Sequence, residues 1–227
     1  MEISTENNWY KNFNLLIFDE IDSTNEEAKR LCHAGIKENF IIWAKSQTKG
    51  KGRQGKKWIS PENNLYLSLL IRPNCTASEA TNFSFLAAIA AGEAIKENSI
   101  NCNSLEYKWP NDLMFNKKKF GGILLESSLK SNSEHIDWLV IGIGINIFSY
   151  PMENIQYPAT SLKEAEIDIS CEKLLGDLMK NFAYYYKKWE IEGFENIRLK
   201  WIEKAMNLGK VITINTNQYY KLWKPQY

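Results

Sequence analysis

The residues Trp138 to Ile147 (WLVIGIGINI) constrain the fold of this chain more than any other stretch. The run is apolar at nearly every position and lacks the regular alternation of a strand with one side in water. Such a pattern predicts a strand that is buried on both faces. We therefore expect this strand to lie at the centre of a sheet.

Two glycines interrupt that apolar run. Gly142 and Gly144 are two residues apart and therefore face the same side of the sheet. They leave a flat floor on which a ring could lie, and Asn146 continues the same face with an amide that could read the edge of a base. Close packing of a helix over the glycines explains the same pattern, so both interpretations stay open.

The other elements follow from apolar periodicity and turn residues. We expect strands over 15–18, 40–44, 65–71, 113–115, 120–126 and 211–214, and helices over 76–97, 171–190 and 194–206. The spacing of Thr76 and Glu79 is that of a capping box, and Ser170 caps the next helix. A polar turn over 116–119 joins two of the strands.

A further helix begins near Ser23 with more polar groups than a cap requires. Ser23 and Glu26 have the spacing of a capping box, and Gly35 suits the position just past the helix. One hydroxyl is enough for capping, whereas Ser23, Thr24 and Asn25 supply two hydroxyls and an amide. The run indicates either simple capping or contact with a polar ligand at the helix N-terminus.

The loop over 47–58 holds three glycines and five cations between two apolar runs. Glycines let the backbone adopt positive φ and approach a ligand closely. Because the net charge of the chain is only +1, these cations form a distinct positive patch. The loop suits an anion, for which phosphate is the commonest candidate, although a solvated hairpin turn explains the same residues.

Two further stretches carry candidate chemistry. Lys119 comes directly before Phe120-Gly121-Gly122, and two glycines in a strand indicate a bulge or a ligand bound against bare backbone. Lys108 and Asp112 flank a turn that contains Pro110. Asn111 and Asp112 are also ordinary turn residues.

Composition excludes several classes of protein. The 227 residues are 44% hydrophobic, enough for one large domain with a substantial core. Charges are nearly balanced, so general affinity for nucleic acid is not indicated. No apolar run is long enough to span a membrane, and the first residues do not read as a secretory signal. Four widely spaced cysteines and two histidines argue against a zinc site or a disulfide framework and favour the cytoplasm.

Taken in order, these motifs resemble those of the biotin protein ligases, or biotin–(acetyl-CoA-carboxylase) ligases. The glycine-rich basic loop of that family corresponds to residues 50–56, GKGRQGK, and its Lys-Trp-Pro-Asn-Asp element is intact over 108–112. The lysine before a Gly-Gly strand is Lys119. Ser23-Thr24-Asn25 and Gly142-Ile-Gly144-Ile-Asn146 also match, so the resemblance extends over roughly residues 14–215.

The resemblance implies an α+β fold with a mixed sheet flanked by helices, related to class II aminoacyl-tRNA synthetases. It implies a catalytic domain over residues 1–207 and, over 208–227, a truncated start of the C-terminal SH3-like β domain. That domain assists ATP binding and carrier docking in the family, so its shortening predicts weakened activity or a chain cut short. No DNA-binding helix-turn-helix is expected before Leu15.

The resemblance also implies a reaction in two steps. The carboxylate of biotin attacks the α-phosphorus of ATP to give biotinyl-5′-AMP, and a lysine of a biotin carboxyl carrier protein then attacks the adenylate. ATP and Mg²⁺ are expected as co-substrate and ion, with no tightly bound prosthetic group. Neither nucleic acid nor membrane is an expected partner, and we expect a monomer or a homodimer.

Site roles follow from the resemblance and from charge. We expect Lys119 against the biotin carboxylate and α-phosphate and Arg53 against phosphate oxygens, because fixed cations stabilise developing negative charge. The residues expected to contact biotin are Ser23, Thr24, Asn25, Gln47, Gly50, Lys51, Trp58, Tyr66, Ser68, Gly122 and Gly142. Those expected to contact ATP or the adenylate are Arg53, Lys108, Asn111, Asp112, Lys119, Gly144 and Asn146, and Asp112 is a candidate Mg²⁺ ligand.

The basic loop is expected to act as a lid that excludes water from the labile adenylate. Lys51 and Lys56 stand where the family usually has arginine, and lysine lacks the planar fork that holds an anion by two bonds. Two other functions stay open. One is a lipoate or octanoate ligase or transferase of the same fold, and the other is a non-catalytic protein that binds biotin or its adenylate.

Overall fold

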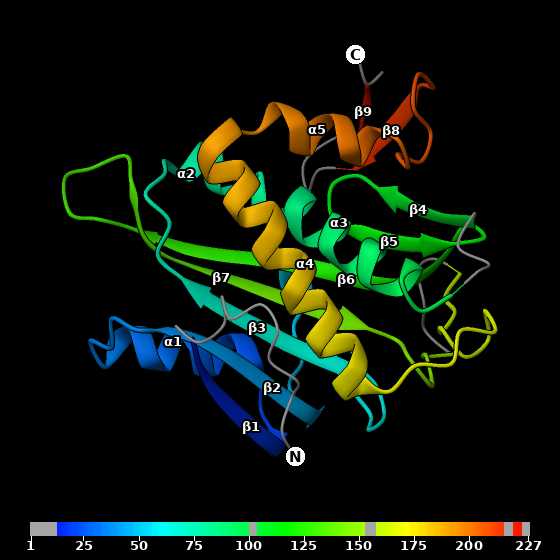
Figure 1. The fold of residues 1–227 in the computed structure, drawn as a ribbon, viewed down its shortest axis with the longest axis horizontal. Coiled ribbons are helices and arrows are strands. Elements are labelled where there is room, and N and C mark those ends of the chain that lie inside the picture. The colour runs from blue at the N-terminus through cyan, green and yellow to red at the C-terminus, as the bar shows by residue number, and fades with distance from the viewer. Residues whose placement is uncertain (1–12, 100–103, 153–157, 216–219, 224–227) are drawn as a thin grey trace.

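The computed structural model describes residues 13–99, 104–152, 158–215 and 220–223. Its centre is a seven-stranded sheet in the order β1-β2-β3-β7-β6-β5-β4 (Figure 1). β1 and β2 run parallel and the other neighbours antiparallel, so the expected mixed sheet is confirmed. The strands are β1 (Phe13–Ile21), β2 (Asn39–Gln47), β3 (Leu65–Ile71), β4 (Leu105–Lys108), β5 (Asp112–Phe115), β6 (Lys118–Leu129) and β7 (Ile136–Ile145).

β7 occupies the middle of the sheet, between β3 and β6, as its apolar run predicts. Its side chains alternate between two hydrophobic clusters, one on each face of the sheet. Leu139, Ile141 and Ile143 belong to the large core cluster, whereas Trp138 and Val140 belong to the smaller one. The strand therefore stabilises both layers of the fold at once.

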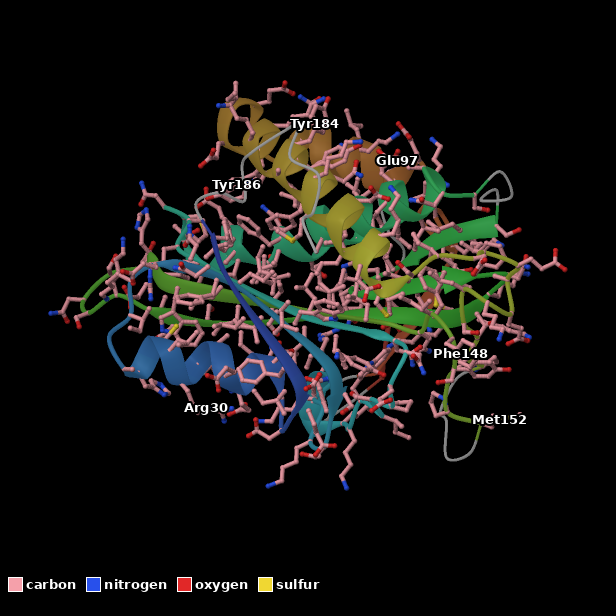
Figure 2. All side chains as sticks on the ribbon, turned by 60° about the horizontal axis from the view of Figure 1, so that its bottom comes forward. Arg30, Glu97, Phe148, Met152, Tyr184 and Tyr186 are labelled. Atoms are coloured by element: carbon pink, nitrogen blue, oxygen red, sulfur yellow. The ribbon has the colours of Figure 1, made fainter. Side chains whose placement is uncertain are left out.

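Helices cover the two faces unequally. α3 (Phe83–Lys96), α4 (Cys171–Glu192) and α5 (Glu195–Ile202) pack on one face and enclose the large core cluster (Figure 1). Among the helices of the described residues, only α1 (Thr24–His33) lies on the other face, as Figure 2 shows from the side. Alternation along β3 follows this division, because Leu67 and Leu69 face the large core and Leu70 faces α1.

The single helix expected over 76–97 is wrong. The capping box of Thr76 and Glu79 is present, but it begins the short helix α2 (Ala77–Ala80), and α3 starts only at Phe83. Between them the backbone bonds tighten to i→i+3, and the Thr81 hydroxyl bonds back to the Ser78 carbonyl at 2.7 Å. Side-chain bonding of this kind competes with a regular helix.

The capping box expected at Ser23 is also wrong. The Ser23 side chain makes no capping bond, and Glu26 instead forms ion pairs with Lys29 and Lys51. A tertiary contact to the basic loop has replaced the local one that the spacing suggested. The other end of α1 is as expected, since Gly35 has φ +81° and donates its N–H to the Cys32 carbonyl.

Several element boundaries differ from expectation. Asn116 and Lys117 form the tight turn with positive φ, so β6 begins at Lys118 and Lys119 lies in the strand, not in the turn. The register shift opposite Leu113 and Met114 is the bulge that the neighbouring glycines predicted. α4 begins after its expected Ser170 cap, whereas α5 is shorter than the expected 194–206.

Near the end of the chain, β8 (Ile212–Asn215) and β9 (Tyr220–Trp223) form an antiparallel pair. The expected division into domains at residue 208 stays a prediction, and part of it lies outside the described residues, as do residues 1–12 and Cys102. The three described cysteines are free. Among the described residues, no helix has the length and apolarity to cross a membrane.

The stabilisation provided by the Asp22 carboxylate, just before α1, can be tested by changing the pH. Hydrogen bonds from Arg30, and a smaller contribution from the Ser23 N–H, hold the pKa of Asp22 at about 2. A lowered pKa stabilises the folded state above the unfolded-state pKa, and the effect disappears as pH falls toward 2. Because the carboxylate is partly exposed, Asp22→Asn is expected to lower the free energy of unfolding by about 1 kcal/mol at pH 7. Urea unfolding at pH 7 and pH 2.5 measures the effect, and an equal loss at both values would contradict it.

Candidate active site

The expected ligand-binding residues converge on the sheet face that α1 covers. Gly142 and Gly144 on β7 and Gly122 on β6 leave bare backbone there. A Cβ on Gly142 would lie 2.2 Å from Asn25 Oδ1, and one on Gly144 would lie 2.6 Å from Trp58 Nε1. The packing of a helix residue is thus confirmed at Gly142, and the Trp58 side chain packs on Gly144, whereas a ligand ring on this floor stays a prediction.

A chain of hydrogen bonds joins the start of α1 to the end of β2. Gln47 Oε1 accepts bonds from the Thr24 N–H at 2.8 Å and from the Thr24 hydroxyl at 3.2 Å. Its Nε2 donates to Ser60 Oγ at 3.0 Å, and Ser60 in turn donates to the Trp58 carbonyl at 2.9 Å. The position of the basic loop is thus linked to the polar N-terminus of the helix.

A second set of polar groups lies beside the first. The Ser68 hydroxyl is 2.7 Å from Thr24 Oγ1 and 2.6 Å from Asn25 Oδ1. Asn25 Nδ2 donates to Glu126 on β6 at 2.8 Å. Thr24, Asn25 and Ser68 are all buried, so these bonds satisfy groups that water does not reach.

The basic loop has a defined conformation. The Gly52 N–H bonds to the Lys56 carbonyl at 2.7 Å, and the Trp58 N–H bonds to the Gly50 carbonyl at 2.9 Å. Of the three loop glycines only Gly55 has positive φ. Gly50 is required for space, since a Cβ there would lie 2.4 Å from the Trp58 carbonyl oxygen.

Lys119 lies at the other end of the glycine floor. Its Nζ is 2.5 Å from Asp112 Oδ1 and 5.4 Å from the centroid of the Trp58 ring. A Cβ on Gly122 would be 3.4 Å from the same Nζ. The structure therefore brings a cation, a carboxylate and an aromatic ring together over bare backbone.

Two loop cations are held by groups outside the loop. Arg53 Nη1 donates to Asn111 Oδ1 at 3.1 Å, and Asn111 is itself held to the Ile123 backbone. Lys51 forms an ion pair with Glu26 on α1. Hydrogen bonds from Lys29 and then Lys51 lower the pKa of Glu26, so its carboxylate is ionised at neutral pH.

Four expected residues lie less directly on this floor. The Tyr66 hydroxyl donates to the Pro61 carbonyl at 2.8 Å, and burial raises its pKa. Asn146 is buried, and its amide donates to the Thr160 carbonyl at 3.1 Å. Ser23 is buried, and Lys108 ends β4 opposite Asp112. The ligand roles of these four residues, like those of all the other expected site residues, stay predictions.

Sequence reasoning missed Glu126 and Ser60. Glu126 is four residues beyond Gly122 on β6, so strand alternation alone places it on the floor side of the sheet. A charged residue on that side was a signal that could have been followed. Ser60 had no comparable signal, because its role depends on the loop folding back so that it pairs with Gln47.

Asp112 was also expected as a Mg²⁺ ligand. The described residues hold no group of three or more His, Cys, Asp or Glu side chains that could bind a metal ion. A single carboxylate nevertheless fits Mg²⁺, which is commonly held by one or two carboxylates together with substrate phosphates and water. Because Asp112 is already paired with Lys119, a bound Mg²⁺ would have to share its carboxylate with the Lys119 ammonium.

The ion pair of Lys51 and Glu26 yields a prediction about the loop. Lys51→Met is expected to raise the hydrogen-exchange rates of amides 50–57 severalfold, because an exposed pair contributes up to about 1 kcal/mol. Added salt should produce a similar change in the unaltered protein. Lys57→Met, in the same loop, is the matched control and should change little. Equal exchange rates in all three proteins would show that the ion pair does not hold the loop.

Comparison with known proteins identifies the family. The sequence profile of the biotin/lipoate A/B protein ligase family matches residues 17–146. The biotin–(acetyl-CoA-carboxylase) ligase of Paracoccus denitrificans is 34% identical over 86% of this chain and 82% of its own length. The bifunctional ligase/repressor BirA of Bacillus subtilis is 30% identical over 91% of this chain, which spans 65% of that relative. A biotin protein ligase from Aquifex aeolicus, solved with biotin and ATP, superposes with a TM-score of 0.76 at 31% identity, covering 93% of this chain and 86% of that one.

The family profile matches more than half of the chain, and the fold is shared with a biotin protein ligase of known structure. The chain belongs to the biotin/lipoate A/B protein ligase family. Within that family it groups with the biotin protein ligases, the relatives to which it is similar over most of its length.

Proposed function

We propose that this protein activates biotin with ATP to biotinyl-5′-AMP and transfers the biotinyl group to a lysine of a biotin carboxyl carrier protein. The observation that carries the proposal is the position of Lys119. Its Nζ lies over the glycine floor beside Asp112 and Trp58, and the hydrogen-bonded group of Thr24, Gln47 and Ser68 lies on the same sheet face.

The polar group at the start of α1 suits the ureido end of biotin. A ureido group presents two N–H donors and one carbonyl acceptor, and hydroxyls and amides can match both kinds. Thr24, Ser68 and Gln47 already form a connected network without ligand, so their side chains are preorganised. Gly50 and Lys51 would lie toward the carboxylate end of the ligand.

Positive charge at the other end suits the activation of the carboxylate. Attack of the carboxylate on the α-phosphorus displaces pyrophosphate and joins two anions, so it requires cations fixed where the charge gathers. Lys119 serves this role at the carboxylate and α-phosphate, and Arg53 reaches phosphate oxygens after leaving Asn111. Bound Mg²⁺ supplies neutralisation of the triphosphate.

Transfer of the biotinyl group to the carrier requires less catalytic assistance from the protein than formation of the adenylate. The adenylate is a mixed anhydride with AMP as its leaving group, so the amine of the carrier lysine attacks an already activated carbonyl. No strong general base is required, and closure of the basic loop protects the adenylate from water until the carrier docks. We place this reaction in the cytoplasm and expect a monomer or homodimer.

An assay of group transfer tests the proposal. The protein is incubated with ATP, Mg²⁺ and a recombinant biotin carboxyl carrier domain, with either biotin or lipoate, and the mass of the carrier is measured. Addition of one biotinyl group to the carrier lysine is expected, and none of lipoyl. Lipoylation would support the other branch of the family, and biotin binding without transfer would support a non-catalytic binding protein.

A further inference from the structure

Glu126 is a charged residue next to the site whose place is not explained by the chemistry above. Its two carboxylate oxygens accept bonds from α1, Oε2 from Asn25 Nδ2 at 2.8 Å and Oε1 from Lys29 Nζ at 2.7 Å. Burial opposes the charge on Lys29, but the carboxylates of Glu126 and Glu26 outweigh burial and raise the pKa of Lys29. Lys29 is therefore a charged ammonium at neutral pH, and its 2.7 Å contact with Glu126 is an ion pair.

The carboxylate of Glu126 fixes which way the Asn25 amide points. An ionised carboxylate accepts hydrogen bonds and cannot donate them. The NH₂ group of Asn25 must therefore face Glu126, which leaves Asn25 Oδ1 facing the Ser68 hydroxyl at 2.6 Å. The Asn25 amide cannot turn over, because its carbonyl oxygen would then face the carboxylate of Glu126.

The orientation of the Asn25 amide also determines which way the hydroxyls of Ser68 and Thr24 donate their hydrogen bonds. Ser68 has one hydroxyl proton, and Asn25 Oδ1 can only accept it. Toward Thr24, whose Oγ1 is 2.7 Å away, Ser68 therefore offers only lone pairs. Thr24 must donate either to Ser68 or to Gln47 Oε1 at 3.2 Å. In both cases the lone pairs of Thr24 Oγ1 remain available to a donor from outside the network.

We propose that Glu126 is a positioning residue for the ligand: by orienting the Asn25 amide, it makes Thr24 Oγ1 a hydrogen-bond acceptor for a ligand N–H. The inference rests on the proposed function, in which that N–H belongs to the ureido ring of biotin. Bonds that run in one direction toward a charge also strengthen one another. Glu126 acts through Asn25 and Ser68 and does not itself touch the ligand.

A purely structural role for Glu126 makes different predictions. Glu126 and Lys29 join β6 to α1, so the residue could serve only to hold the helix on the sheet. In that case loss of either partner would weaken folding and ligand binding together. If Glu126 orients the Asn25 amide, biotin binding is weakened only by changes that allow this amide to turn over.

Three variants separate these roles. Glu126→Gln keeps the shape of the side chain but can donate as well as accept, so Asn25 can turn over. Lys29→Met removes the ion pair and leaves the bond from Asn25 to Glu126. The double variant Asn25→Asp with Glu126→Gln exchanges amide and carboxylate, so residue 25 can again only accept from Ser68.

Calorimetric titration with biotin and steady-state kinetics test the inference. Glu126→Gln is expected to weaken biotin binding about tenfold and to raise the KM for biotin equally, with kcat and the KM for ATP unchanged. Lys29→Met should bind biotin within about threefold of the unaltered protein, and the double variant should bind biotin more tightly than Glu126→Gln alone. Thermal unfolding of each variant confirms that it is folded.

The outcomes are distinct. Unchanged biotin affinity in Glu126→Gln, or an equal loss in Lys29→Met, would overturn the positioning role while leaving the proposed function intact. Failure of the double variant to recover affinity would overturn it as well. Absence of biotin binding by the unaltered protein would contradict the proposed function, and the inference would fall with it.

Discussion

Replacement of Lys119 by alanine is expected to lower the rate of biotinyl-AMP formation about a thousandfold, while biotin binding largely persists. The physical reason is that Lys119, whose Nζ lies 2.5 Å from Asp112 and above Gly122, is proposed to supply fixed positive charge where the carboxylate and α-phosphate meet. The groups proposed to bind the ureido end are on other elements and keep their contacts. Biotin-dependent release of pyrophosphate and calorimetric titration with biotin measure the two quantities separately.

Lys118 provides the matched control. It is the preceding residue on β6, and its ammonium pairs with Glu164 at 3.1 Å, away from Asp112. Lys118→Ala should therefore retain nearly normal pyrophosphate release. Because Lys119→Ala also leaves Asp112 without its ion pair, Lys119→Ala with Asp112→Asn should be made as well, and it should be equally inactive. Retained pyrophosphate release in Lys119→Ala would contradict the assignment.

Gly142→Ala is expected to weaken biotin binding about a hundredfold, because one added methyl group displaces a hydrogen-bonded amide. The new Cβ would lie 2.2 Å from Asn25 Oδ1, closer than any real contact of this kind. Movement of Asn25 breaks its bonds to Ser68 and Glu126 together. Titration with biotin measures the loss, and the free energy of unfolding should fall as well.

A double-mutant cycle with Asn25→Ala identifies the cause. If the clash with Asn25 is responsible, Gly142→Ala should cost less than about threefold in affinity once the amide has been removed. Biotin binding by Gly142→Ala within threefold of the unaltered protein would show that the site tolerates a side chain there.

Much of the fold could be predicted because hydrophobic periodicity reports burial directly. The apolar run of β7, with no regular alternation, indicated its central position in the sheet. Capping was less predictable, because Ser23 and Glu26 have the right spacing but Glu26 instead pairs with Lys29 and Lys51. A local pattern competes with tertiary partners that the spacing does not reveal.

The sequence indicated most of the residues that lie together in the candidate site, but not the hydrogen bonds that join them. Thr24, Gln47 and Ser68 come from three segments, and only the register of the sheet and the packing of α1 bring them within hydrogen-bond distance. Lys119 was expected in a turn, whereas positive φ at Asn116 and Lys117 closes the turn earlier and carries Lys119 into β6. No spacing rule predicts that closure.

Biotin-dependent exchange of labelled pyrophosphate into ATP tests the central claim most directly, because it reports formation of the acyl adenylate without a carrier protein. We expect exchange that requires biotin, is absent with lipoate, and is lost in Lys119→Ala but not in Lys118→Ala. A folded protein that bound biotin but catalysed no exchange, or a Lys119→Ala variant that exchanged at the normal rate, would contradict the proposed activation of biotin.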